Sequence, residues 1–175
     1  GHNALLDENV KGGALDADYT VATIENCDIK NFTAADGGAV YTSGASLTIT
    51  NSNFYHCISN KTGDTNGGGA VQTTAATVNV SDSTFIDCEA QFQGGGLYHN
   101  NAREGSSFIM TGSTFANCSA RAGGGVETLA QKANVTNCTF TNCRAETKGD
   151  AAGTNGGGLN IYSGHSENLN TTSAT

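Results

Sequence analysis

The stretch STFIDCEAQFQGGGLY, residues 83–98, places a phenylalanine, a cysteine three positions later and then three glycines before an apolar residue. Thirty residues on, the chain repeats this order as STFANCSARAGGGVE, residues 113–127. Self-similarity at a spacing of about 20–50 residues is the signature of a repeat protein. The fold therefore depends on how far this pattern extends along the chain.

The repeat covers nearly the whole chain when the apolar residue after each glycine run is taken as its anchor. The anchors are Leu15, Val40, Val71, Leu97, Val126 and Leu159, and the large apolar residues that follow them are Ile29, Phe54, Phe85, Phe115 and Phe140. The separation is 14 residues in four arcs and 18 in the other, where NNAREGSS (100–107) is an insertion. The return arc varies from 11 to 19 residues, which predicts a loop that tolerates insertions.

Each constant arc predicts three short strands. Apolar residues stand seven and five positions before the aromatic one, as in Leu47 and Ile49 before Phe54, and this period of two indicates a strand with one buried face. Residue types that tolerate a left-handed turn follow, at Asn26, Asn51, Asp82, Gly112 and Asn137. Further strands hold the aromatic residue and the anchor. Each repeat thus has two tight corners and one open corner.

Such a unit is one coil of a parallel β-helix, in which successive coils stack about 4.8 Å apart. A single coil cannot bury its apolar face, so the stack supplies the core. We therefore predict an all-β solenoid of about five to six coils, forming one domain over residues 1–175. The chain is either this whole unit or a segment of a longer solenoid.

These motifs resemble known families of right-handed, single-stranded parallel β-helices, the pectate-lyase-like superfamily. Over residues 12–162, the GGAV and FxxC segments are similar to the GGA and FxxN repeats of chlamydial polymorphic outer-membrane proteins, and to repeats of secreted algal and protist surface proteins. The asparagine of FxxN is a cysteine here, at Cys57, Cys88, Cys118 and Cys143. The resemblance implies an adhesin, a surface fibre or a passenger domain.

Composition excludes several classes of function. The chain has 175 residues with 24 glycines, no proline or tryptophan, and a net charge of −8, which argues against nucleic acid and anionic membranes as partners. No apolar run approaches the roughly 18 residues of a membrane span. The sequence begins at Gly1-His2, so we expect either that a signal peptide has been removed or that this is a piece of a longer chain. We expect a secreted or cell-surface location.

The cysteines fall into two columns. Cys57, Cys88, Cys118 and Cys143 share one position on four consecutive coils, where a spacing of about 4.8 Å lies within disulfide range. Two interpretations are open. Either disulfide bridges join Cys57 to Cys88 and Cys118 to Cys143, or the four cysteines form a column of buried free thiols. Cys27 and Cys138 lie in another column, four coils apart, so roughly 19 Å separates them. They are either free thiols or form disulfides with another subunit. The sequence contains no CxxC pair, so nothing in the cysteine spacing suggests a metal or another cofactor.

Catalysis on this scaffold requires acidic side chains that project outward from neighbouring coils. There are two outward columns: Asp28, Asn53, Thr84, Thr114 and Thr139; and Asp16, Tyr41, Gln72, Tyr98, Glu127 and Asn160. The carboxylates in them are isolated from one another, and the simplest interpretation is that each is a solvated surface group. The histidines, at positions 2, 56, 99 and 165, form no triad pattern. We predict a protein that is not an enzyme, with a polysaccharide-active fragment as the alternative.

Other outward features suggest binding. Threonine-rich columns raise ice binding as a further alternative: Thr50, Ser81, Thr111 and Thr136; and Thr84, Thr114 and Thr139. The loops 58–66 and 144–155 share Lys, Gly-Asp and Thr-Asn, and are ligand sites or tolerated insertions. Sequons for N-linked glycans occur at Asn31, Asn60, Asn79, Asn117, Asn134 and Asn170, and also at Asn137, which lies at a tight corner and is the poorest acceptor.

The coil ends suggest self-association. The first coil begins partway, near Ala4 and Leu5, and the last lacks an aromatic residue near Ser173. Uncapped coils expose strand edges that stack readily. We therefore expect end-to-end or lateral assembly, and a structural or adhesive surface element in a fibre or long rod.

Overall fold

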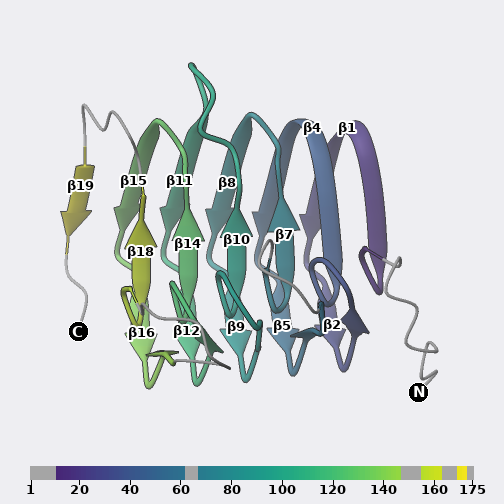
Figure 1. The fold of residues 1–175 in the computed structure, drawn as a ribbon. Helices are drawn as coiled ribbons and strands as arrows, with labels where there is room; N and C mark the ends of the chain where they lie inside the picture. Colours follow the sequence, from purple (N-terminus) through teal and green to yellow (C-terminus); the bar gives the residue numbers. More distant parts are fainter. Residues whose placement is uncertain (1–10, 62–66, 147–154, 163–168, 173–175) are drawn as a thin grey trace.

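The chain winds as a parallel solenoid in which every coil adds strands to the same sheets (Figure 1). A computed structural model describes residues 11–61, 67–146, 155–162 and 169–172. In those ranges the chain forms strands and turns and contains no helix, and every paired strand is parallel to its partner. The predicted all-β, parallel β-helix is confirmed.

Two sheets form the main walls of the solenoid. The larger has ten strands: β1 (Leu15–Glu25), β4 (Val40–Thr50), β7 (Val71–Thr73), β8 (Thr77–Ser81), β10 (Leu97–His99), β11 (Ser107–Thr111), β14 (Val126–Thr128), β15 (Lys132–Thr136), β18 (Leu159–Ile161) and β19 (Leu169–Thr172). The smaller has five: β2 (Asp28–Lys30), β5 (Asn53–Tyr55), β9 (Thr84–Ile86), β12 (Thr114–Ala116) and β16 (Thr139–Thr141). The register matches equivalent repeat positions, such as Phe54 with Phe85.

A third, narrow wall follows the cysteine position, where we predicted only the start of an open corner. It consists of two-residue strands: β3 (Thr33–Ala34), β6 (Ile58–Ser59), β13 (Ser119–Ala120) and β17 (Arg144–Ala145). Glu89 bridges Ile58 and Ser119, so this wall continues across the middle coil. Two-residue pairings are too short to show a period of two in the sequence.

One predicted corner is missing from the first two coils. β1 and β4 each run through 11 residues, where the repeat predicted two strands separated by a turn. In later coils Ala75 and Ala130 are buried at this point, and their amides bond to the hydroxyls of Thr73 and Thr128 two residues earlier. Gly44 takes the equivalent place in β4 and pairs with β1 instead.

The core consists of columns that run along the solenoid axis. Phe54, Phe85, Phe115 and Phe140 stack ring on ring, with centroid distances of 4.6, 4.5 and 5.3 Å. Opposite them lie the two apolar columns predicted from the period of two; Leu47, Val78 and Phe108 of the first are fully buried. Each coil thus buries its apolar side chains against the same residue types on its neighbours.

In the runs that have three glycines, the three serve different purposes, as GGG at 94–96 illustrates. Gly94 has a φ of 55°, which turns the loop into the next strand. A Cβ on Gly95 would overlap the Gly124 carbonyl and lie 2.6 Å from the amide of Ser119, because the glycine strand lies directly against the narrow wall. A Cβ on Gly96 would lie 2.7 Å from the Phe115 ring. The run therefore lets the backbone approach both the wall and the aromatic stack.

Candidate functional site

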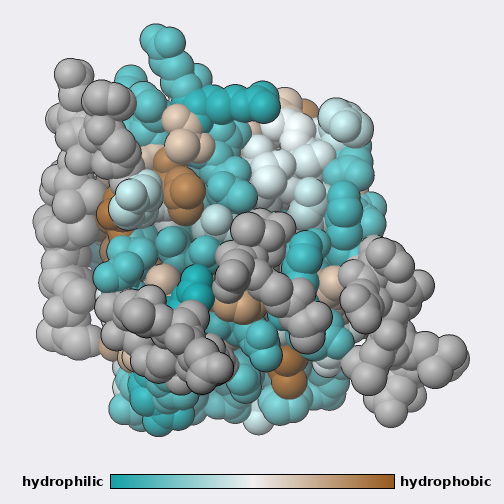
Figure 2. All heavy atoms as spheres, viewed as in Figure 1, coloured by the Kyte–Doolittle hydropathy of each residue, from teal (hydrophilic) through white to brown (hydrophobic). Residues whose placement is uncertain are grey.

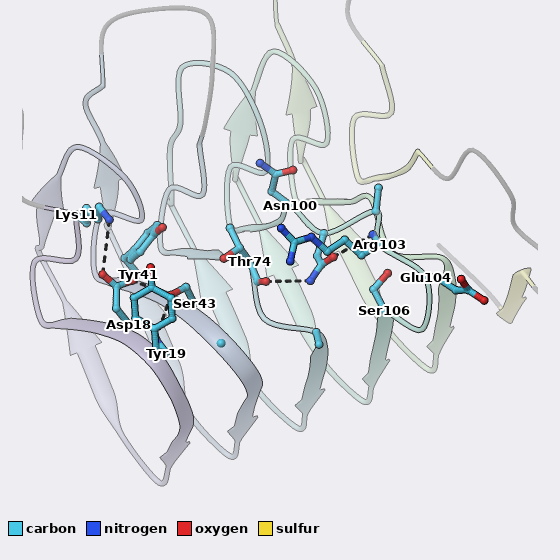
Figure 3. Close-up of a pocket in the computed structure, with 14 residues that line it drawn as sticks. Lys11, Asp18, Tyr19, Tyr41, Ser43, Thr74, Asn100, Arg103, Glu104 and Ser106 are labelled. Carbon is cyan, nitrogen blue, oxygen red and sulfur yellow. Dashed lines mark hydrogen bonds and ion pairs between the residues drawn. The ribbon is translucent and has the colours of Figure 1, made fainter.

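An open groove of about 750 Å³ crosses the outer surface of the first coils, where the anchor strands lead into the strands that follow them (Figure 3). Its lining comes from coils that are far apart in sequence, from Lys11 to Ser106. The rest of the visible surface is predominantly hydrophilic, with hydrophobic residues scattered or in small groups (Figure 2). The groove is thus a concave feature available for binding, and a second hollow of about 350 Å³ lies over β2, β5 and β9.

The insertion at residues 100–107 forms one wall of the groove, and it projects beyond the outline of the coils between β10 and β11 (Figure 1). Asn101 ties its base to the coil below by donating to the carbonyls of Thr74 and Ala75, at 3.0 and 3.2 Å. The Asn101 Oδ1 in turn accepts the amide of Arg103, at 3.0 Å. Ser106 accepts the amide of Gln131 from the following coil. These bonds hold the insertion in a fixed conformation.

The opposite wall contains a strained tyrosine. Tyr19 has a φ of 57° and 93% of its surface is exposed. It lies where the register between β1 and β4 shifts, and its amide donates to Ser43, whose hydroxyl donates to Asp18. A left-handed conformation is unfavourable for a bulky residue, and such strain often marks functional positions.

The charges in the groove are unequally committed. Lys11 lies 3.8 Å from the Asp18 carboxylate and 4.5 Å above the Tyr41 ring, and these two neighbours raise the pKa of Lys11. The guanidinium of Arg103 has no hydrogen bond or ion pair with any residue that the structure describes. Figure 3 shows it extending over the groove toward Thr74, whereas Glu104 points away. The groove therefore presents one uncommitted cation.

The sequence interpretation of the column that includes Gln72, Tyr98 and Glu127 is wrong. We expected all three side chains to project outward and the Glu127 carboxylate to be solvated, but all three are buried, Glu127 to 7% exposure. The glycine turn before each anchor folds back over the outer face of the strand, so that a Cβ on Gly123 would lie 2.8 Å from the Glu127 Cβ. A turn that covers a neighbouring strand from outside leaves no mark in the alternation of polar and apolar residues.

Glu127 is consequently a buried acid in an unusual state. Burial raises its pKa to about 7, and the opposing effects of Asn160 and Arg121 do not restore the ordinary value. Its Oε2 has no hydrogen-bond partner, and neither has Oε1 of Gln72 in the same column. Burial and the charge of Glu127 also raise the pKa of Tyr98. Paired acid catalysis needs a second carboxylate, whereas the side chains that act on the pKa of Glu127 are Asn160 and Arg121.

The cysteine column lies in the core as expected. Cys57, Cys88 and Cys118 are fully buried and Cys143 is partly exposed, and neighbouring thiols are in contact. Contacts with the thiols of Cys118 and Cys57, together with burial, raise the pKa of Cys88. All six cysteines are free thiols in this structure. Bridges between neighbouring coils of the chain, Cys57–Cys88 and Cys118–Cys143, and a column of buried thiols both stay open.

Cys27 and Cys138 occupy the two ends of a column of serines. Each amide donates to the hydroxyl of the next coil: Cys27 to Ser52, Ser52 to Ser83, and Ser83 to Ser113, at 3.1–3.2 Å. Burial raises the pKa of Cys138. Whether these thiols bond to another subunit stays a prediction.

The candidate glycan acceptors differ in their surroundings. Asn79 on β8 and Asn134 on β15 share an outward position, as expected, and both pair with Ile109 on the strand between them, β11. Asn31 and Asn117 share a left-handed turn, with φ of 62° and 54°, and the amide of Asn117 donates to Asp87. Asn60 is partly buried beside the narrow wall, Asn137 lies at its tight corner with a φ of 53°, and only the backbone of Asn170 is described.

Other predicted positions have less to do with binding. The hydroxyls of Ser81 and Thr136 donate to Thr50 and Thr111, at 3.3 Å, so this column is partly bonded to itself. His99 is fully buried between Thr128 and the Ala75 carbonyl, and burial lowers its pKa to about 4. Most of the loops 58–66 and 144–155, and Ala4, Leu5, His2, His165 and Ser173, lie outside the described residues.

Sequence reasoning missed the groove because its walls are an insertion and an irregular strand. The signal for one wall was present, since the 18-residue arc identified residues 100–107. The strained Tyr19 had none, because its bulge depends on pairing with Gly44 of the next coil. In the ranges described, no three His, Cys, Asp or Glu side chains gather as a metal site, and no helix has the length and apolar character to cross a membrane.

Comparison with known proteins identifies the architecture. A family model described as a right handed beta helix region matches residues 2–173. No curated protein and no solved structure matches the chain.

Proposed function

Because the chain belongs to the family of right-handed β-helix proteins, we propose that it is a structural or adhesive surface element, without enzymatic activity, in an extracellular fibre or long rod. The family relationship supports the rod, since stacked coils form a stiff one-dimensional scaffold. The role of the rod must come from the side chains that project from it.

The observation that carries this proposal is the pairing of outward polar side chains with their equivalents on the next coil. The amide of Asn51 donates to Asn26 and that of Asn53 to Asp28, at 2.6 and 2.8 Å. Asn117 and Asn142 continue the same arrangement from Asp87. Side chains that are bonded along the axis reinforce the stack and are less available to act on a substrate.

The groove supplies the adhesive part of the proposal. It is lined by residues from several coils, its walls are held by hydrogen bonds, and Arg103 and Tyr19 project from them. Preformed concave sites with a few convergent polar groups are the usual places for ligands. N-linked glycans at exposed positions such as Asn134 are compatible with a secreted rod.

Electron microscopy and sedimentation of the native, secreted protein test the structural role. We expect rods or filaments, formed end to end or laterally. Incubation with polygalacturonate and other polysaccharides, followed by assays for new reducing ends and unsaturated products, tests the absence of enzymatic activity. Dispersed monomers at all concentrations, or turnover of a polysaccharide, would contradict the proposal.

A further inference from the structure

The groove has the features of a site that recognises one negative charge. Arg103 is its uncommitted cation, because Lys11 is already engaged by Asp18 and Tyr41. A guanidinium carries five donors in a planar fork that matches a carboxylate in a two-point contact. The whole chain is acidic, with 16 Asp and Glu against 8 Lys and Arg, so a free arginine held over a groove is a local exception.

The aromatic residues favour a single side chain as the ligand group rather than a row of sugar rings. Lys11 covers one face of the Tyr41 ring, at 4.5 Å from its centroid. This leaves Tyr19 as the freely exposed aromatic side chain of the groove. Polysaccharide stacking uses successive open ring faces, whereas tyrosine and arginine together are the residue types that contribute most at protein–protein contacts.

The floor between these two residues can bind an extended backbone. The side chains of Asn100 and Thr74 are both partly exposed and line the groove. Neither side chain has a hydrogen-bond partner among the residues that the structure describes. Both line the same groove as Arg103 (Figure 3). An amide and a hydroxyl offer the donors and acceptors that a peptide backbone requires.

Both walls are fixed before any ligand arrives. Asn101 fastens the insertion that carries Arg103, and the bulge beside Gly44 holds Tyr19 in its strained conformation. A site that is already ordered avoids part of the entropic cost of binding. The volume of about 750 Å³ is within the range of ligand sites and accommodates several residues.

We propose that this groove binds an acidic segment of a partner protein, with a glutamate or aspartate carboxylate on Arg103 and a neighbouring side chain against Tyr19. This inference rests on the proposed adhesive role, for which it names the partner class. The carboxylate supplies the charge complementarity, and Asn100 and Thr74 bond to the backbone of the segment.

Fluorescence polarisation with labelled hexapeptide pools tests the site in the full chain. One pool carries Glu at its two central positions with random flanks, and the matched pool carries Gln there. We expect the Glu pool to bind more tightly and to weaken with added salt. Arg103→Ala should reduce its affinity about tenfold to a hundredfold, the loss of a charge-assisted pair, with partial recovery in Arg103→Lys.

Matched variants separate the two contacts from the fold. Arg144→Ala removes an exposed arginine of β17 that pairs with Glu146, and the affinity of this variant for the Glu pool should equal that of the wild type. Tyr19→Gly relieves the strain of the positive φ, so this variant should have a higher thermal stability than the wild type and a lower affinity for the Glu pool. Equal binding of the Glu and Gln pools, no binding of either, or an undiminished Arg103→Ala affinity would overturn the inference. Binding of oligogalacturonate in place of peptides would assign the groove to a saccharide and overturn it as well.

Electron microscopy of the Arg103→Ala variant distinguishes this inference from the proposed function. We expect rods or filaments with the wild-type appearance and no peptide binding. Peptide binding by a wild-type protein that never assembles would reject the fibre role and leave the groove assignment standing.

Discussion

At the scale of single residues, Glu127 is a buried carboxylate whose pKa lies far from its ordinary value. Its pKa is raised from 4.5 to about 7 by burial. Between these two values the unfolded chain has lost a proton that the folded chain retains, so stability falls as the pH rises through this window. The contribution of protonated Glu127 to the free energy of unfolding is fully present below pH 4.5 and is lost above pH 7.

Glu127→Gln should abolish this part of the pH dependence. The shift corresponds to about 3 kcal/mol at most, so the variant should be more stable than the wild type at pH 8 by several degrees in Tm, and equal to it near pH 4.5. Thermal unfolding between these pH values measures the difference. The exposed Glu25→Gln is the control, and parallel curves for the wild type and Glu127→Gln would contradict the prediction.

At the scale of the repeated elements, the glycine runs set how closely the walls of a coil approach. Gly69 lies against the narrow wall, where a Cβ would overlap the Gly95 carbonyl and lie 2.5 Å from the Glu89 amide. Backbone cannot move aside as a flexible side chain can, so the collision must distort two coils.

Gly69→Ala should therefore destabilise the fold by about 3 kcal/mol or more. Gly105→Ala is the matched control, because Gly105 has no atom within 4 Å of an added Cβ and only its φ of 81° opposes alanine. Its cost should be about 1–2 kcal/mol. Urea unfolding followed by circular dichroism measures both, and equal losses would show that packing against the wall is unimportant.

The aromatic stack is the second repeated element with a measurable contribution. Phe85 is fully buried and contacts the rings of Phe54 and Phe115 in parallel, at 4.6 and 4.5 Å. Phe85→Ala should lower the free energy of unfolding by about 3–5 kcal/mol, since it leaves a cavity in the middle of the column. Tyr55→Ala, with its half-exposed ring, should cost much less. A small loss for Phe85→Ala would mean that neighbouring rings collapse into the gap.

At the scale of the whole molecule, coils contact only their neighbours, so any link between coils adds directly to cohesion. The cysteine column offers such links, because the thiols of Cys57 and Cys88, and of Cys118 and Cys143, are in contact. Cys88 also contacts the thiol of Cys118, so contact alone does not select which neighbours are bridged.

Alkylation of the denatured, unreduced protein followed by mass spectrometry tests the bridges. If the bridges form, we expect two modified thiols, Cys27 and Cys138, and two crosslinked peptides that join Cys57 to Cys88 and Cys118 to Cys143. The reduced protein provides the control with six modified thiols. Modification of all four thiols of the column without reduction would establish a column of free thiols.

How much of this the sequence predicts depends on whether a feature repeats. The anchors, the aromatic column, the left-handed turn and the cysteine column recur at a fixed spacing, and each was located by residue from that spacing alone. The burial of Glu127 could not be predicted in this way, because the glycine turn that covers Glu127 belongs to the preceding loop. Nor could the third wall, whose strands have only two residues.

The sequence by itself determined the stacked, parallel coils, because identical residue types must meet on neighbouring coils to be buried. Only the tertiary structure decided where the regular pattern gives way to a site. Tyr19 and Arg103 are 84 positions apart, and they line one groove because stacking brings the bulge of β1 and the insertion after β10 to the same outer surface. Irregular segments carry no period, so their meeting place depends on packing in three dimensions.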